Sequence, residues 1–117
     1  EVLTLHLPLT TKTRGLYDAR TLSRLRPDAV LINTCRGSIV DEDSLADRLA
    51  SGALQAACFD VFEIEPTTND RLLALPNFLA TPHIGASAQE TRLAMARAAI
   101  AGLTDNRPVV PAEYQDL

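Results

Sequence analysis

The sequence predicts an α/β protein built on a parallel sheet that helices cover on both faces. Two observations point to this fold class. Short apolar runs alternate with segments of helical periodicity along the 117 residues, and each run is almost continuously apolar. Strands of that kind are typical of parallel sheets buried on both sides, whereas half-exposed strands alternate apolar and polar residues. We therefore expect strand, loop and helix units that repeat along one domain.

The first unit starts with the apolar run VLTLHL at residues 2–7. Turn-forming residues follow from Pro8 to Gly15, and Asp18 then precedes Leu22 and Leu25 at helical spacing. This order predicts a strand, a loop and a helix.

The second unit repeats that pattern. Residues 29–34 (AVLINT) form the next apolar run, Asp41 is placed to cap a helix, and Gly52 stands just past the end of that helix. One face of the predicted helix carries Leu45, Ala46 and Leu49.

Two further strands are predicted at residues 54–59 (LQAACF) and 77–81 (NFLAT), with a polar loop and a single helical turn near residues 71–75 between them. The last helix is the best marked, because Ser87 and Glu90 have the spacing of a capping box. It should end near Asn106, and its apolar face is formed by Leu93, Ala96, Ile100 and Leu103.

Nearly all side chains with catalytic chemistry follow the carboxyl ends of these strands. In parallel sheets those ends share one edge, where loops and helix N-termini face the ligand. The opposite edge carries ordinary turns, such as residues 26–28 (RPD). The candidates at the expected site edge are His6, the segment 34–37 (TCRG), Asp60, Glu63, Glu65 and the segment 81–83 (TPH).

Each candidate also has a purely structural interpretation. An arginine after a strand is commonly a solvated surface group, although Gly37 beside Arg36 would let the backbone approach a ligand closely. Glu63 and Glu65 lie in an acidic loop of the kind that is usually solvated, and Pro66 stiffens the backbone beside Glu65. His6 is expected to support the structure or line the site.

His83 is the candidate hardest to explain structurally. It stands at a rigid corner between Pro82 and Gly85, and histidine changes charge nearest neutral pH. Arginine offers two parallel donors to a carboxylate, and histidine can exchange a proton with a hydroxyl or carbonyl oxygen. Together they suit substrates that carry a carboxylate beside a hydroxyl or keto group. A neighbouring carboxylate would orient the histidine ring and favour its charged form.

Composition excludes several classes of function. A net charge of -4 and a pI near 5.0 leave no basic surface for nucleic acid. No apolar run approaches the roughly 20 residues that span a bilayer, so we expect a cytoplasmic protein without membrane contact. Cys35 and Cys58 lack the spacing of a zinc knuckle or disulfide framework, and we expect no metal site; Cys35 fits a small buried residue better than an activated thiolate.

Four ordered motifs identify a family. The segments HLPLT, LINTCRGSIVDEDSLADRLASG, DVFEIEP and TPHIGAS resemble the NAD-binding domain of the D-isomer-specific 2-hydroxyacid dehydrogenases, the phosphoglycerate dehydrogenase and glyoxylate reductase superfamily. The resemblance covers about residues 1–105. It implies a Rossmann-type fold in which residues 1–106 form the C-terminal part of the NAD-binding domain and residues 107–117 return toward the substrate domain.

The resemblance also implies a role for each site residue. Arg36 would bind the substrate carboxylate, Glu65 would pair with the histidine, and His83 would act as the acid/base. Asp60 would accept a hydrogen bond from the nicotinamide carboxamide. The residues expected near NAD are His6, Pro8, Thr34, Cys35, Arg36, Asp60, His83, Gly85 and Ala86.

The implied activity is NAD-dependent interconversion of a D-2-hydroxy acid and a 2-keto acid by a homodimer. The alternative is a non-catalytic, NAD-responsive binding module that resembles a corepressor. The five glycines (15, 37, 52, 85 and 102) form no Gly-x-Gly-x-x-Gly loop, and Glu1 already lies in a strand-like pattern. The resemblance places the pyrophosphate loop upstream, so we expect no hydride transfer by these residues alone. We expect them either to self-associate through an exposed strand edge at residues 2–7 or to belong to a longer chain.

Overall fold

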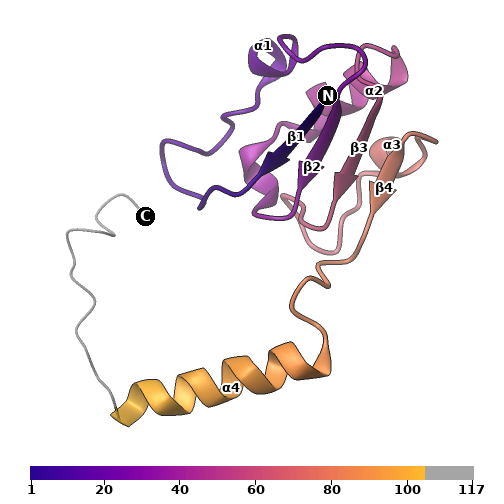
Figure 1. Ribbon diagram of the computed structural model, residues 1–117. Helices are drawn as coiled ribbons and strands as arrows, with labels where there is room; N and C mark the ends of the chain where they lie inside the picture. Colours follow the sequence, from indigo (N-terminus) through magenta and orange to yellow (C-terminus); the bar gives the residue numbers. More distant parts are fainter. Residues whose placement is uncertain (105–117) are drawn as a thin grey trace.

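The computed structural model describes residues 1–104, which form a four-stranded parallel sheet with helices (Figure 1). The sheet order is β1-β2-β3-β4, which is the order of the strands in the chain. The elements are β1 (Val2–Leu5), α1 (Ala19–Leu22), β2 (Val30–Asn33), the 3₁₀ turn η1 (Gly37–Ile39), α2 (Glu42–Ala50), β3 (Ala56–Phe59), α3 (Asp70–Leu73), β4 (Phe78–Ala80) and α4 (Gln89–Thr104).

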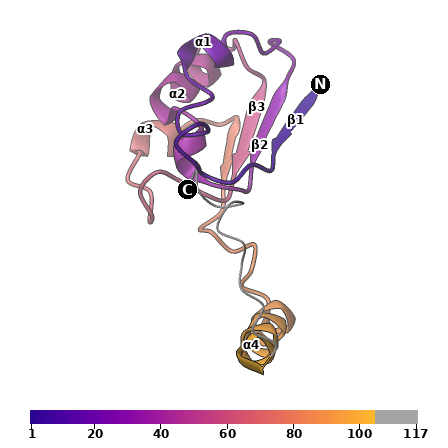
Figure 2. The ribbon, with the colours of Figure 1, turned by 90° about the vertical axis from the view of Figure 1, so that its left-hand side faces the viewer.

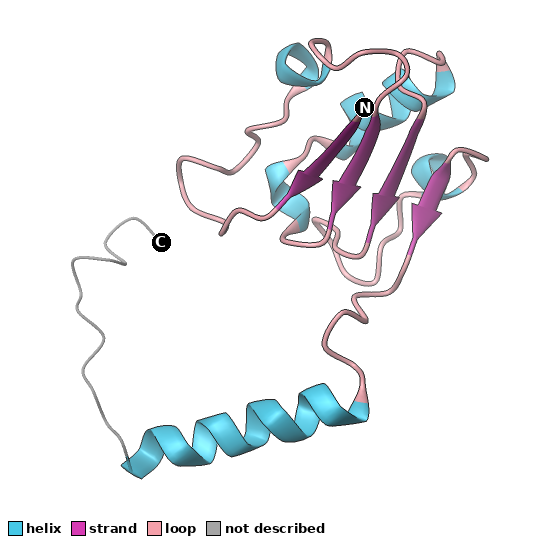
Figure 3. Cartoon of the chain, viewed as in Figure 1, coloured by secondary structure: helices cyan, strands magenta, loops and turns pink. Residues whose placement is uncertain are grey.

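The four strands end at the same level of the sheet. Leu5 pairs with Asn33, Asn33 with Phe59, and Phe59 with Ala80, and these are the last residues of β1 to β4. The loops that follow therefore all start at one edge, where the sequence placed the candidate residues (Figure 3). His6 and Thr34, expected at strand ends, instead begin these loops.

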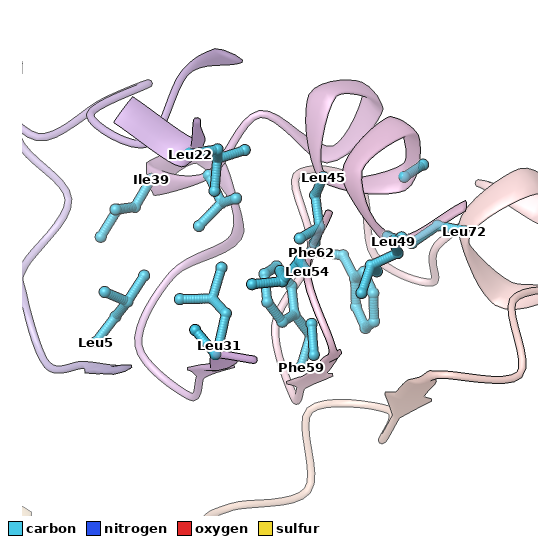
Figure 4. Packing of buried hydrophobic residues seen from close by; sticks show 14 residues of the cluster. Leu5, Leu22, Leu31, Ile39, Leu45, Leu49, Leu54, Phe59, Phe62 and Leu72 are labelled. Carbon is cyan, nitrogen blue, oxygen red and sulfur yellow. The ribbon is translucent and has the colours of Figure 1, made fainter. Parts of the chain in front are cut away.

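The core fills the space between the sheet and the helices α1 to α3, which lie together on one face (Figure 2). Figure 4 shows this packing, with Leu31 and Phe59 from the sheet facing Leu22 and Leu45 from the helices. Aromatic rings close the side near β4, where Phe59 and Phe78 lie edge to face with centroids 5.5 Å apart.

Within residues 1–104, helices cover only one face of the sheet, so the expectation of two covered faces is wrong for the described structure. The strands nevertheless point apolar side chains to the open face, where Val2 is 63% and Leu79 62% exposed. The strands are continuously apolar in sequence because both of their faces carry apolar side chains, although no segment within residues 1–104 packs on the open face. β1 forms one edge of the sheet, as expected.

Local signals explain the short helices. The Asp18 side chain accepts the backbone N–H of Thr21 at 2.7 Å, which lowers the pKa of that carboxyl, and α1 is one turn long. Asp41 caps α2 by accepting the backbone N–H groups of Asp43 and Ser44. Gly52 follows α2 with φ +71°, the left-handed conformation that glycine adopts without strain.

The last helix leads away from the sheet (Figure 1). A cap at Ser87 would start the helix at Ala88, but α4 starts at Gln89. The first helical hydrogen bond runs from the N–H of Arg92 to the carbonyl of Ala88. Its apolar face is largely open, with Leu103 82% exposed. The predicted end near Asn106 and the segment 107–117 lie outside the described residues. Among residues 1–104, no helix has the length and apolar character to cross a membrane.

Candidate active site

Glu65 and His83 form a hydrogen-bonded pair at the carboxyl edge of the sheet. Glu65 follows β3 and His83 follows β4, and Oε2 of Glu65 lies 2.7 Å from Nδ1 of His83. The other carboxylate oxygen of Glu65 accepts the backbone N–H of Phe62 at 3.0 Å. The hydrogen bond from His83, and then that from Phe62, lower the pKa of Glu65 below its ordinary value. The pair is partly open to solvent, since the side chains are 49% (His83) and 38% (Glu65) exposed.

The backbone of His83 has φ +54°, in the left-handed region. Non-glycine residues are uncommon there, although histidine, asparagine and aspartate are enriched, and such conformations gather at functional sites. The backbone N–H of His83 donates to the carbonyl of Thr81 at 3.0 Å, which closes the tight turn.

Asp60 anchors the loop that carries His83. This buried carboxylate accepts the hydroxyl of Thr81 and the backbone N–H of Ile84 on Oδ1, and the backbone N–H of Gly85 on Oδ2. Burial by itself raises the pKa of Asp60, but these hydrogen bonds outweigh burial, so the pKa is lower than normal. Asp60 therefore stays ionised at neutral pH and ties the end of β3 to the turn after β4.

The same carboxylate also suits the cofactor contact implied for it. Oδ2 of Asp60 accepts one hydrogen bond, from Gly85, and a carboxylate oxygen can accept a second. A Cβ atom at residue 85 would lie 3.2 Å from Oδ2, so the glycine keeps this oxygen uncrowded. The residues present thus fit a carboxamide donor such as that of nicotinamide. Next to Asp60, a cavity of about 70 Å³ on the open side of the sheet is also lined by Thr34 and Thr81.

Gly37 has a different role from the predicted one. A Cβ atom at this position would lie 1.9 Å from the carbonyl carbon of Phe62 and 2.3 Å from the backbone nitrogen of Glu63. The space that a side chain at residue 37 would occupy is filled by this backbone. The expectation that the glycine lets a ligand approach there is therefore wrong. The glycine instead lets the loop after β2 pack directly on the loop that carries Glu65.

The structure divides the predicted catalytic residues between two cavities. Glu65 and His83 line a mainly apolar cavity of about 550 Å³. The exposed side chain of Arg36 lines another, of about 400 Å³, together with His6, Pro8 and Cys35. Both cavities open at the carboxyl edge of the sheet, but the described residues do not join Arg36 directly to the Glu65–His83 pair.

The remaining candidates have local partners. Nε2 of His6 lies 2.9 Å from Oγ1 of Thr4 on the exposed side of β1. The backbone N–H of Glu63 donates to Glu42 at 2.8 Å, and its side chain lines a different cavity, of about 210 Å³, from the one at His83. Cys35 is half-buried, which is less than the sequence predicted, and its thiol donates to Asn33.

Asn33 is a site residue that the sequence patterns did not single out. It is the last residue of β2, and its fully buried side chain bonds to the segment that contains Arg36. The available signal is a lone amide inside an apolar run, at the point where the strand ends.

Comparisons with known proteins agree on one family. Residues 1–85 match the family described as D-isomer specific 2-hydroxyacid dehydrogenase, NAD binding domain. The chain is 46% identical over 104 residues to glyoxylate/hydroxypyruvate reductase B of Pectobacterium carotovorum, a match that covers 88% of this chain and 32% of that protein. It is 41% identical over 96 residues to D-3-phosphoglycerate dehydrogenase of Bacillus subtilis, covering 82% of this chain and 18% of that protein.

Solved structures give the same result. The NADPH-dependent glyoxylate/hydroxypyruvate reductase of Sinorhizobium meliloti, in complex with NADP and malonate, superimposes with a TM-score of 0.84 at 39% identity, over 88% of this chain and 32% of that one. A D-isomer specific 2-hydroxyacid dehydrogenase of Xanthobacter autotrophicus, in complex with NADPH, gives a TM-score of 0.75 at 37% identity, over 93% and 46%. The chain thus spans about a third or less of the curated relatives described here.

Proposed function

This chain belongs to the D-isomer specific 2-hydroxyacid dehydrogenase family, and we propose that the protein containing it reduces a 2-keto acid to a D-2-hydroxy acid with a nicotinamide cofactor. The observation that carries the proposal is the 2.7 Å hydrogen bond between Glu65 and His83, at the edge of the sheet that also presents Arg36. Charge and proton-transfer groups for a keto acid are thereby gathered on one side of the molecule.

Each of the three residues has a distinct task in this proposal. The guanidinium of Arg36 binds the substrate carboxylate, for which its planar pair of donors is suited. Because Nδ1 of His83 is bonded to Glu65, Nε2 is the ring nitrogen that gives its proton to the keto oxygen during reduction and takes it back during oxidation. Glu65 fixes the ring orientation and, as a carboxylate, stabilises the protonated imidazole.

The cofactor contacts follow from the loops at the same edge. When bound, the nicotinamide supplies or accepts the hydride. Asp60 would hold its carboxamide, and the segments 6–8, 34–36 and 83–86 would surround it. We propose NAD as the cofactor, and the NADP and NADPH bound in the solved relatives make NADP the competitor to test.

We further propose that the protein works in the cytoplasm as a homodimer. Acidic composition and two free cysteines, Cys35 and Cys58, fit a reducing compartment. Light scattering of the whole protein measures the oligomeric state, and a monomer at working concentration would contradict this part of the proposal.

The direct test of the activity uses the whole protein. NADH and NADPH oxidation is measured with a panel of 2-keto acids that includes glyoxylate, and the configuration of the product is determined. Turnover to a D-2-hydroxy acid, lost when Arg36 is replaced by alanine or His83 by glutamine, is the expected result. Tight NADH binding without turnover of any panel member would instead favour the corepressor-like binding module.

A further inference from the structure

We infer that Asn33 is the positioning residue for Arg36 and thereby sets the affinity of the enzyme for the substrate carboxylate. This inference rests on the proposed function of Arg36 as the carboxylate ligand. Asn33 does not touch the substrate. It acts through the backbone of the segment 34–36.

The side chain of Asn33 is fully buried, and the hydrogen bonds of both its polar atoms go to one short segment. Nδ2 donates to the carbonyl oxygen of Arg36 at 3.0 Å. Oδ1 accepts the backbone N–H of Cys35 at 3.1 Å and the Cys35 thiol at 3.1 Å. One side chain therefore fixes the peptide groups on both sides of the segment that leads to the Arg36 side chain.

The same residue joins this segment to the rest of the site. The backbone carbonyl of Asn33 accepts the N–H of Asp60 at 3.0 Å, and Asp60 holds the turn that carries His83. Asn33 thus lies between the Arg36 loop and the anchor of the His83 loop, at the end of β2, one of the two inner strands of the sheet.

Core packing does not require an amide at this position. In the same register row, the neighbouring strands end in Leu5 and Phe59, which are apolar and buried. A buried amide is costly unless its hydrogen bonds are made, and here all of the bonds go to residues 35 and 36. The amide is therefore explained by its hydrogen bonds, which hold the backbone of Cys35 and Arg36 in place.

Arg36 itself is exposed, and within the described residues its guanidinium donates to the carbonyl of the adjacent Cys35 at 2.6 Å. No acidic partner from another element restrains the guanidinium among residues 1–104. Its position therefore depends on its backbone, and a small shift of that backbone moves the guanidinium relative to the substrate.

The test compares steady-state kinetics of the whole enzyme with Asn33→Leu, which is close in volume, and Asn33→Asp, which keeps the acceptor for Cys35 but loses the donor to Arg36. We expect KM for glyoxylate to rise about tenfold in both, the effect of weakening one hydrogen bond between the Arg36 guanidinium and the substrate carboxylate. We expect kcat per NADH-binding site to change less than KM, and the Kd for NADH to stay within about twofold of the original value.

The matched control is Asn77→Leu. Asn77 also braces backbone, donating to the carbonyls of Leu49 and Gln55 at 3.2 and 3.1 Å, but at the opposite edge of the sheet. A purely structural defect lowers the number of active sites and leaves KM unchanged, which is the result expected for this control.

A double-mutant cycle separates this inference from the function on which it rests. If Arg36→Leu leaves KM for glyoxylate unchanged, the carboxylate assignment itself is wrong. If Arg36→Leu raises KM, the Asn33 and Arg36 changes should not add, because a misplaced guanidinium and a missing one lose the same contact. Fully additive effects, or an unchanged KM in both Asn33 variants, would overturn the positioning role. If Asn33→Leu does not fold, the test rests on Asn33→Asp. If neither variant folds, hydrogen exchange of the Cys35 amide is measured in the unmodified enzyme, and fast exchange would refute the hydrogen bond to Asn33.

Discussion

Replacing Gly37 with alanine should separate the two loops that form the candidate site. The added Cβ atom would lie 1.9 Å from the carbonyl carbon of Phe62 and 2.2 Å from its oxygen, whereas ordinary van der Waals contact begins at 3.4 Å. Both obstacles are backbone atoms, which cannot rotate away as a side chain can. The loops must therefore move apart by about 1.5 Å, and we expect a cost at or above the usual upper value of about 3 kcal/mol for overpacking.

This displacement should also reach Glu65 and His83, the proposed catalytic pair. Phe62 donates its backbone N–H to Glu65, so a shift of residue 62 loosens the carboxylate that orients His83. We expect the apparent melting temperature of the whole protein to fall by several degrees and kcat for keto-acid reduction to fall at least tenfold, the effect expected from misplaced catalytic groups.

The matched control is Gly102→Ala in α4, where an added Cβ meets no atom of residues 1–104 within 4 Å. Alanine is the better helix former by about 1 kcal/mol, so this variant should be as stable as the original protein or slightly more stable. A Gly37→Ala protein that melts and turns over like the original would refute the close packing of the two loops.

Three further predictions concern charge and association. Asp60→Asn should destabilise the protein at pH 7 by about 1–3 kcal/mol. An amide has only one acceptor oxygen, so its NH₂ group must face the backbone N–H of either Ile84 or Gly85. Since the folded-state pKa of Asp60 lies below its ordinary 3.8, its stabilisation is present above that pH and is lost as the pH falls through the folded value. In chemical denaturation, the difference in free energy of unfolding between the original protein and Asp60→Asn should therefore be smaller at pH 3 than at pH 7. A difference that does not change with pH would contradict this role of Asp60. Glu65→Gln should lower kcat for keto-acid reduction at least tenfold, because the carboxylate that orients the His83 ring through Nδ1 is replaced by an amide; an unchanged kcat argues against the pair. The 117-residue chain alone should self-associate through its open sheet face and β1 edge and transfer no hydride, so a monodisperse active monomer in light scattering and NADH-oxidation assays would be the opposite outcome.

Much of the fold was predictable because its signals are local. Continuous apolar runs, a cap such as Asp41 and a terminating glycine such as Gly52 act within a few residues of the structure they specify. The parallel strands then bring the candidate residues to one edge, whichever helices cover the sheet. Within residues 1–104 the expectation of two covered faces is wrong, because an apolar strand face does not reveal what packs against it.

The hydrogen-bond network of the site was less predictable because its partners are distant in sequence. The contact between Glu65 and His83 was expected only through the family resemblance. The anchoring by Asp60 joins residues more than twenty positions apart, and the close contact of Gly37 with Phe62 depends on how two loops meet. Asn33 was overlooked because a single polar residue at a strand end carries no spacing or motif.

The proposed role of His83 as proton donor is tested most directly by the single-turnover rate of 2-keto acid reduction by the whole protein with His83→Asn. Asparagine tolerates the left-handed backbone at φ +54°, so the variant removes the proton donor with little added strain. With NADH and glyoxylate both saturating, and NADH affinity measured by fluorescence on the same samples, we expect unchanged NADH binding and a rate lower by about 10²–10⁴-fold. NADH oxidation by His83→Asn at the rate of the unmodified enzyme would contradict it.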